Sequence, residues 1–194
     1  MGSSPISGTI LLGDYMSLII NESNLEQKDI QEHNEKVRVL LVDDNDNILV
    51  ANYGQVYLLP GGSIDQGENL YQAALRELKE ETGMEYNLAE LEYLNTIEYY
   101  QKDYPKRNNS VYNRLIKTNY LIARYKGIDL NCIELTEKER KDNFKLELVS
   151  LDDLEKLITN NKNDNPRNIF FQKELLTILE YYKKTLDKNK KNDL

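Results

Sequence analysis

The sequence contains no tryptophan, a single cysteine and no long apolar run. The single cysteine, Cys132, excludes an internal disulfide framework and suits a reducing cytoplasm. No apolar run approaches the roughly 18 residues that a membrane span requires. The first residues lack the basic segment and long apolar stretch that mark a secretory signal. These absences predict a cytoplasmic protein without a membrane partner.

Basic residues are also in short supply. Lys and Arg total 25 against 33 Asp and Glu, so the formal net charge is -8. Proteins that follow a nucleic-acid backbone normally carry a basic excess, and this composition argues against nucleic acid as a partner. An acidic protein that binds phosphates usually needs metal cations to do so. Without tryptophan, a base-stacking surface would have to come from tyrosine, phenylalanine or arginine.

The order of predicted strands and helices indicates an α/β layered domain. β-branched and apolar runs predict strands at residues 37–42, 48–51, 55–59, 119–125 and 144–148. The first of these strands is apolar except for Arg38, and a turn-forming cluster makes it a hairpin with the second. Periodicity and capping residues predict helices at 69–82, 150–159 and 165–184. The polar segment 101–112, which contains Pro105, is predicted to be a loop.

We expect three parts along the chain. Residues 1–36 are mixed in composition and predict a partly flexible leader with a short strand near residues 18–20. Residues 37–160 would form the domain itself. Residues 161–194 would form a C-terminal helix that packs on the domain and frays at its end. The leader and this helix are the candidates for a contact in a homodimer.

Residues 62–84 place three glutamates on the core side of a helix. At about 100° per residue, Glu77, Glu80 and Glu81 fall within roughly one 100° sector. A solvated charged face is the alternative for such a helix. However, Glu77 and Glu81 fall inside the sector of the apolar stripe, which consists of Leu70, Ala73, Ala74 and Leu78. Carboxylates turned toward a core repel one another unless a cation lies among them, and Mg²⁺, or Mn²⁺, fits that role.

The same segment resembles the Nudix box, G-x5-E-x7-R-E-U-x-E-E-x-G-U, in which U is aliphatic. Every defined position matches, namely Gly62, Glu68, Arg76, Glu77, Leu78, Glu80, Glu81, Gly83 and Met84. At ordinary residue frequencies, a chance match anywhere in such a chain is on the order of one in a million or less. The resemblance implies a Nudix-type α/β/α sandwich with a mixed central sheet and an added C-terminal helix.

The resemblance also implies roles for individual residues. Arg76 would orient a glutamate. Glu77 is the first candidate for the general base, ahead of Glu81, while Glu137 and Glu139 in a later loop are the alternatives. Glu68 would be either a metal ligand or an anchor for the start of the helix. The other implied ligands of Mg²⁺ are Glu77, Glu80, Glu81 and the backbone carbonyl of Gly61.

A Nudix-type protein would be a metal-dependent hydrolase that cleaves a phosphoanhydride bond of a nucleoside diphosphate linked to another moiety. Nucleoside triphosphates, nucleotide sugars, ADP-ribose, dinucleoside polyphosphates and coenzyme-type dinucleotides are all candidate substrates. Arg107 and Arg114 are candidate phosphate contacts. The alternatives are a sensor that binds a nucleotide such as ADP-ribose without turnover, removal of an RNA cap, and isomerisation of an isoprenoid diphosphate. The intact glutamates favour hydrolysis, and the acidic charge disfavours RNA.

Overall fold

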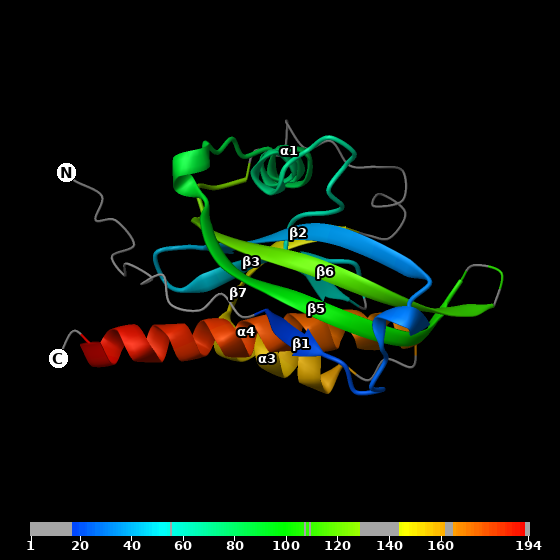
Figure 1. The fold of residues 1–194 in the computed structure, drawn as a ribbon. Helices are drawn as coiled ribbons and strands as arrows, with labels where there is room; N and C mark the ends of the chain where they lie inside the picture. The colour runs from blue at the N-terminus through cyan, green and yellow to red at the C-terminus, as the bar shows by residue number, and fades with distance from the viewer. Residues whose placement is uncertain are drawn as a thin grey trace.

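A mixed seven-stranded sheet forms the centre of the protein (Figure 1). We analysed it in a computed structural model that describes residues 17–128, 144–161 and 165–192, apart from residues 55, 107 and 109. The strand order is β1-β5-β6-β2-β3-β4, with β7 paired to β3. β1 pairs with β5, and β2 with β6, in parallel, whereas the other pairs are antiparallel. The strands are Leu18–Ile20 (β1), Glu32–Val42 (β2), Asn47–Asn52 (β3), Tyr57–Leu58 (β4), Glu92–Pro105 (β5), Val111–Arg124 (β6) and Lys145–Ser150 (β7).

Helices cover both faces of this sheet. Figure 1 shows α1 on one face and α3 and α4 on the opposite face. Two short 3-10 turns lie in the connections, η1 between β1 and β2 and η2 between α1 and β5. The arrangement is an α/β/α sandwich, which confirms the predicted fold class. The helices and turns are Leu70–Thr82 (α1), Leu151–Asn160 (α3), Pro166–Asn192 (α4), Gln27–Asp29 (η1) and Leu88–Glu90 (η2).

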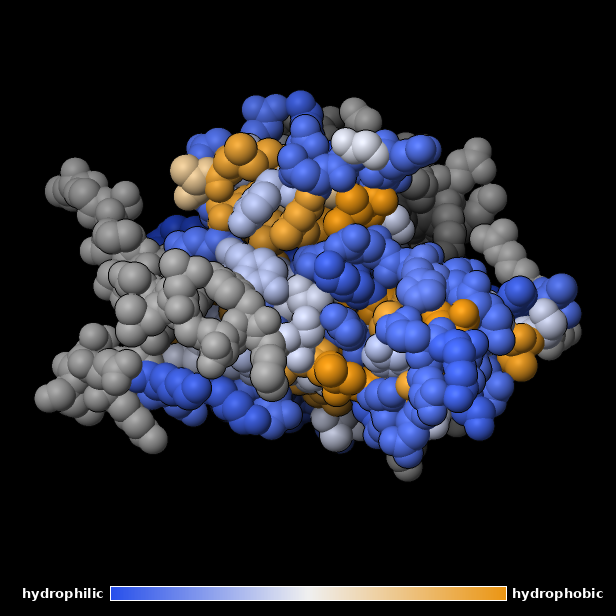
Figure 2. Space-filling view, viewed as in Figure 1, coloured by the Kyte–Doolittle hydropathy of each residue, from blue (hydrophilic) through white to orange (hydrophobic). Residues whose placement is uncertain are grey.

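Strand β2 contributes to two separate hydrophobic cores because its successive side chains point to opposite faces. Val37, Val39 and Leu41 lie in the cluster beneath α1. Leu40 and Val42 lie in the cluster that α3 and α4 cover. Figure 2 shows apolar side chains gathered beneath α1 at the top of the view. The central strand is therefore buried on both faces, which explains its nearly continuous apolar sequence.

The described part of the expected leader belongs to the sheet. β1 pairs with β5 from Leu18↔Ile97 to Ile20↔Tyr99. β2 begins at Glu32, earlier than the predicted start at Val37, and its added residues pair with β6. Their charged and amide side chains obscured the strand in the sequence. The predicted division into leader, domain and C-terminal helix stays a prediction. The structure describes the leader only from residue 17 onward.

The loop predicted at residues 101–112 is shorter than expected. β5 continues through Pro105 and β6 begins at Val111, so the two strands form one long hairpin. The ring of Tyr104 packs edge-on against that of Tyr112 across the pair, with centroids 5.8 Å apart. Cross-strand aromatic pairs stabilise such ladders even where the flanking residues are polar. Pro105 is tolerated because it is the last residue of its strand.

Helix α4 begins at Pro166, as predicted, and runs to Asn192. Its buried residues Leu175, Ile178 and Leu179 belong to the hydrophobic cluster beneath the sheet. α4 is thus an integral part of the second core. None of the helices in the described part of the chain is long and apolar enough to cross a membrane.

We expect Ile178→Ala to lower the free energy of unfolding by about 2–5 kcal/mol, because it leaves a cavity in a closed core. Ile169→Ala, on the exposed side of the same helix, is the matched control and should change stability by less than about 0.5 kcal/mol. Urea denaturation of both variants measures the difference. Equal effects would mean that α4 does not close the core.

Candidate active site

Helix α1 is capped at both ends. Asn69 is the N-cap, and its side-chain oxygen accepts hydrogen bonds from the backbone N–H groups of Tyr71 and Gln72. The Gln72 side chain accepts from the Asn69 N–H in return, which completes a capping box. Gly83 ends the helix in the left-handed conformation, with φ 69°. These local signals place the helix where the sequence predicted it.

The loop before α1 approaches its neighbours closely at two glycines, and at the first of them the backbone requires glycine. Gly61 has a φ of 132°, and a Cβ there would collide with the carbonyl oxygen of Val37 on β2. A Cβ on Gly62 would collide with the carboxylate of Glu77. β2 holds the loop in place, since the Val37 N–H donates to the Gly62 carbonyl over 3.0 Å. The Glu77 carboxylate therefore lies directly against the loop backbone.

The guanidinium of Arg76 binds three of the predicted glutamates. Its Nε and Nη2 donate to the two carboxylate oxygens of Glu68 over 2.8 and 2.9 Å, a bidentate ion pair. Its Nη1 donates to Glu77 over 2.8 Å and to Glu80 over 3.3 Å. One arginine thus brings together side chains from the loop and from two turns of α1.

Glu81 binds the loop from the buried side of α1. It is 5% exposed, and its Oε2 accepts from the Gly61 N–H over 2.9 Å. The carbonyl of the same glycine accepts from Nη1 of Arg38. A carbonyl oxygen has a second lone pair, so it can still take a further ligand. Glu81 and the Gly61 carbonyl therefore lie at the same point of the loop.

Burial is the main influence on the pKa of Glu77. It raises the pKa of this carboxyl above the ordinary value, and the charge of Glu80 acts in the same direction. The hydrogen bond and charge of Arg76 oppose the rise, and so does the charge of Arg38. Because the net shift is upward, the cations of the chain do not fully compensate this carboxylate. A further cation would stabilise its anionic form.

The chemistry of these donors fits a hard divalent cation. They are carboxylate and carbonyl oxygens, the ligands that Mg²⁺ prefers and that Mn²⁺ also accepts. Within the described ranges, no three side chains of His, Cys, Asp and Glu converge closely enough to enclose an ion.

The remaining residues singled out in the sequence lie away from α1 or outside the described residues. Arg114 lies on β6, where its guanidinium stacks 3.2 Å from the ring centroid of Tyr104 and donates to Gln101 over 2.7 Å. It is buried among these neighbours and does not contact the box. Outside the described residues lie Glu137, Glu139, Arg107 and Cys132.

Arg38 is the residue at this site that the sequence reasoning did not assign. From β2 its Nη1 donates to the carbonyl of Leu59 over 2.8 Å and to that of Gly61. Its charge also lowers the pKa of Glu77, so the two side chains are electrostatic neighbours. Nε and Nη2 make no hydrogen bond to any described residue. In the sequence, the one feature that could have indicated this role is that Arg38 is the single charged residue in an otherwise apolar predicted strand, residues 37–42.

Arg76 lowers the pKa of Glu68 from its ordinary 4.5 to about 2, chiefly through the side-chain hydrogen bond. A carboxyl whose pKa is depressed by folding stabilises the fold above its unfolded pKa and loses that effect as pH falls. We therefore expect Glu68→Gln to be less stable than wild type at neutral pH. The difference in free energy of unfolding should shrink as pH falls from 4.5 toward 2. Urea denaturation in EDTA over this range measures it, and a constant difference would point to lost packing instead.

Comparison with known structures shows the same fold at low sequence identity. A NUDIX hydrolase from Nitrosomonas europaea is 16% identical, with a TM-score of 0.53 over 78% of this chain and 89% of that chain. The NUDIX domain of Shewanella oneidensis NrtR, solved with ADP ribose, is 19% identical, with a TM-score of 0.51 over 84% and 94%. The MutT protein from Methanosarcina mazei Go1 is 14% identical, with a TM-score of 0.50 over 82% and 96%.

The family assignment rests on the sequence as well as the fold. No curated protein matches the chain. A family model described as NUDIX domain matches residues 32–170, which is more than half of the chain and includes the whole box. The chain therefore belongs to the NUDIX domain family.

Proposed function

We propose that this protein is a metal-dependent hydrolase that cleaves a phosphoanhydride bond of a nucleoside diphosphate linked to another moiety. The observation that carries the proposal is the meeting of α1 and the glycine loop, where Glu81 binds the Gly61 N–H and Glu77 lies against Gly62. Carboxylates held at a loop backbone suit a divalent cation that in turn binds substrate phosphates.

The ligands we propose for Mg²⁺, or Mn²⁺, are Glu77, Glu80, Glu81 and the carbonyl of Gly61. When bound, the ion would neutralise charge on the diphosphate and lower the pKa of the attacking water. We assign Glu68 as an anchor instead of a ligand. Both of its carboxylate oxygens already bind Arg76, and one also accepts from the Asp65 N–H over 3.1 Å.

Glu77 is our candidate for the general base. Burial raises its pKa, which makes the ionised carboxylate a stronger base than an exposed glutamate. The hydrogen bond from Arg76 fixes one of its oxygens, so the other is the one available to accept a proton. Arg76 therefore acts as a positioning residue. Glu137 and Glu139 stay as alternative bases.

Arg38 supplies the positive charge that the diphosphate needs on the side of the loop opposite α1. Two backbone carbonyls hold its Nη1, which leaves Nε and Nη2 to donate to phosphate oxygens. A guanidinium presents donors in a planar fork that matches phosphate geometry. Because Arg38 also acts electrostatically on Glu77, a phosphate bound to it would lie beside the proposed base.

Glu81→Gln should lower metal-dependent release of the nucleoside phosphate product by roughly 10²- to 10⁴-fold, because it removes one ligand charge while keeping the bond to Gly61. The assay is a panel of nucleotide sugars, ADP-ribose, dinucleoside polyphosphates and nucleoside triphosphates with Mg²⁺ or EDTA. Glu85→Gln, an exposed glutamate beyond the end of α1 that pairs with Lys79, is the matched control and should keep wild-type activity.

Two outcomes would contradict the proposal. One is turnover that survives both EDTA and Glu81→Gln. The other is tight nucleotide binding without turnover of any compound, which would favour a sensor.

A further inference from the structure

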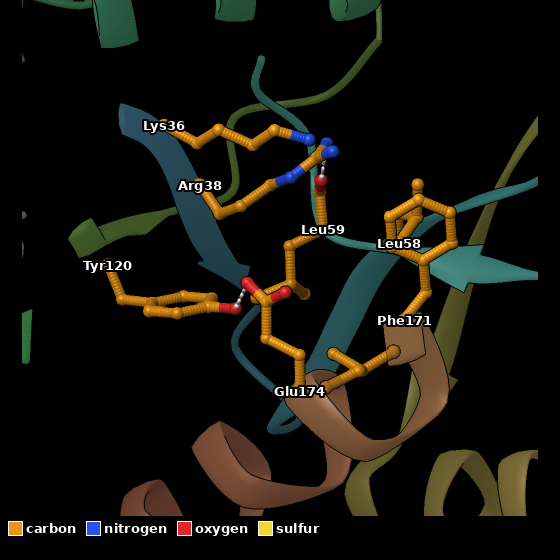
Figure 3. A pocket seen from close by; sticks show the side chains of 8 residues that line it. Lys36, Arg38, Leu58, Leu59, Tyr120, Phe171 and Glu174 are labelled. Atoms are coloured by element: carbon orange, nitrogen blue, oxygen red, sulfur yellow. Dashed lines mark hydrogen bonds between the residues drawn. The ribbon is translucent and has the colours of Figure 1, made fainter. Parts of the chain in front are cut away.

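A second polar feature lies on the α4 face of the sheet, next to the glycine loop. It is a pocket that opens to solvent. Figure 3 shows side chains from β2, β4, β6 and α4 around it. Charged and phenolic side chains interrupt an otherwise apolar lining. The lining residues are Lys36, Arg38, Leu58, Leu59, Tyr120, Phe171, Glu174 and Leu175.

Glu174 is the unusual member of this lining. It is 8% exposed, and its Oε1 accepts a hydrogen bond from the Tyr120 hydroxyl over 2.8 Å. That is its only hydrogen bond or ion pair among the described residues, so Oε2 has no donor there. Figure 3 shows the carboxylate of Glu174 rising from α4 toward Tyr120 and Leu59. This oxygen is not buried and can accept a hydrogen bond from a ligand in the pocket.

The hydroxyl of Tyr120 remains the donor in its hydrogen bond with Glu174. Burial raises the pKa of its hydroxyl well above the ordinary value, and the charge of Glu174 adds to the rise. The phenol therefore stays protonated and donates to Glu174. An ionised carboxylate only accepts hydrogen bonds. The inner end of the pocket consequently selects a ligand group that donates.

The opposite side of the pocket is cationic and leads to the proposed active site. Lys36 and Arg38 extend from β2 on the same side, toward the loop that contains Leu59 (Figure 3). Arg38 hydrogen bonds the Gly61 carbonyl and lowers the pKa of Glu77. A ligand that fills the pocket would thus have phosphate at its cationic end, beside Glu77. The part attached to that phosphate would point at Glu174.

We propose that Glu174 determines substrate specificity, accepting a hydrogen bond from the exocyclic amino group of a nucleobase held between Phe171 and the leucines of the pocket. This inference rests on the proposed function, because it names the moiety attached to the phosphate. Flat apolar contact suits a base, while a lone acceptor oxygen suits its amino group. A base with a carbonyl at that position would face the carboxylate with a second acceptor and be disfavoured.

Binding of nucleoside monophosphates tests this proposal, because they contain no anhydride bond to be cleaved. Isothermal titration calorimetry would compare AMP with IMP, GMP with IMP, and CMP with UMP. We expect the amino-bearing member of at least one pair to bind roughly 10- to 100-fold more tightly, as hydrogen bonds to a charged acceptor do. In Glu174→Gln that ratio should fall to near one. In Lys36→Met both members of the pair should weaken alike.

Glu180→Gln, an exposed glutamate on the same helix that pairs with Lys184, is the matched control and should keep the wild-type ratio. Glu174→Asp withdraws the carboxylate by one methylene and should lose the preference even if Glu174→Gln does not fold. Equal binding within every pair, no nucleotide binding at all, or a ratio that survives both Glu174 variants would overturn the proposal. Base preference without hydrolysis of any anhydride would refute the proposed function alone, and hydrolysis without base preference would refute this inference alone.

Discussion

Like charges on one face of α1 are the constraint on which the rest of the site depends. Glu77 and Glu81 share the side of the helix that packs on the core, where unpaired carboxylates are costly. The chain compensates them in part, with the guanidinium of Arg76 and the backbone N–H of Gly61. The remaining deficit is visible in the raised pKa of Glu77. A divalent cation would remove that deficit, which is why the same residues serve both the fold and the chemistry.

The central strand β2 connects this site to the pocket on the other face of the sheet. Its alternate side chains carry the core beneath α1 on one face, and Lys36 and Arg38 on the other. Arg38 reaches back to the carbonyls of Leu59 and Gly61, so the glycine loop binds Glu81 and Arg38 at once. A single loop therefore joins the glutamates of α1 to the cationic side of the pocket.

Features set by short-range interactions were predictable from the sequence. The caps of α1 at Asn69 and Gly83 are local hydrogen-bond and conformational preferences, and the helix lies where they indicate. The extension of β5 and β6 into residues 101–112 was not predicted, because the pairing near Tyr104 is a cross-strand contact among polar residues. The hydrogen bond from Arg38 to Gly61 could not be predicted either, because strand alternation does not tell which backbone atoms a long side chain contacts. The same holds for Glu174, which the polar helix sequence does not distinguish from its exposed neighbours.

Mn²⁺ binding to the metal-free protein is the property that tests the role of the α1 glutamates most directly. Electron paramagnetic resonance of free Mn²⁺ during a titration measures it without any substrate. We expect saturable binding in the wild type, strong weakening in Glu77→Gln and Glu81→Gln, and no change in Glu85→Gln, whose side chain pairs with Lys79 outside the site. A wild-type protein that binds no Mn²⁺, or variants that bind it as tightly as wild type, would contradict the assignment of these glutamates as metal ligands.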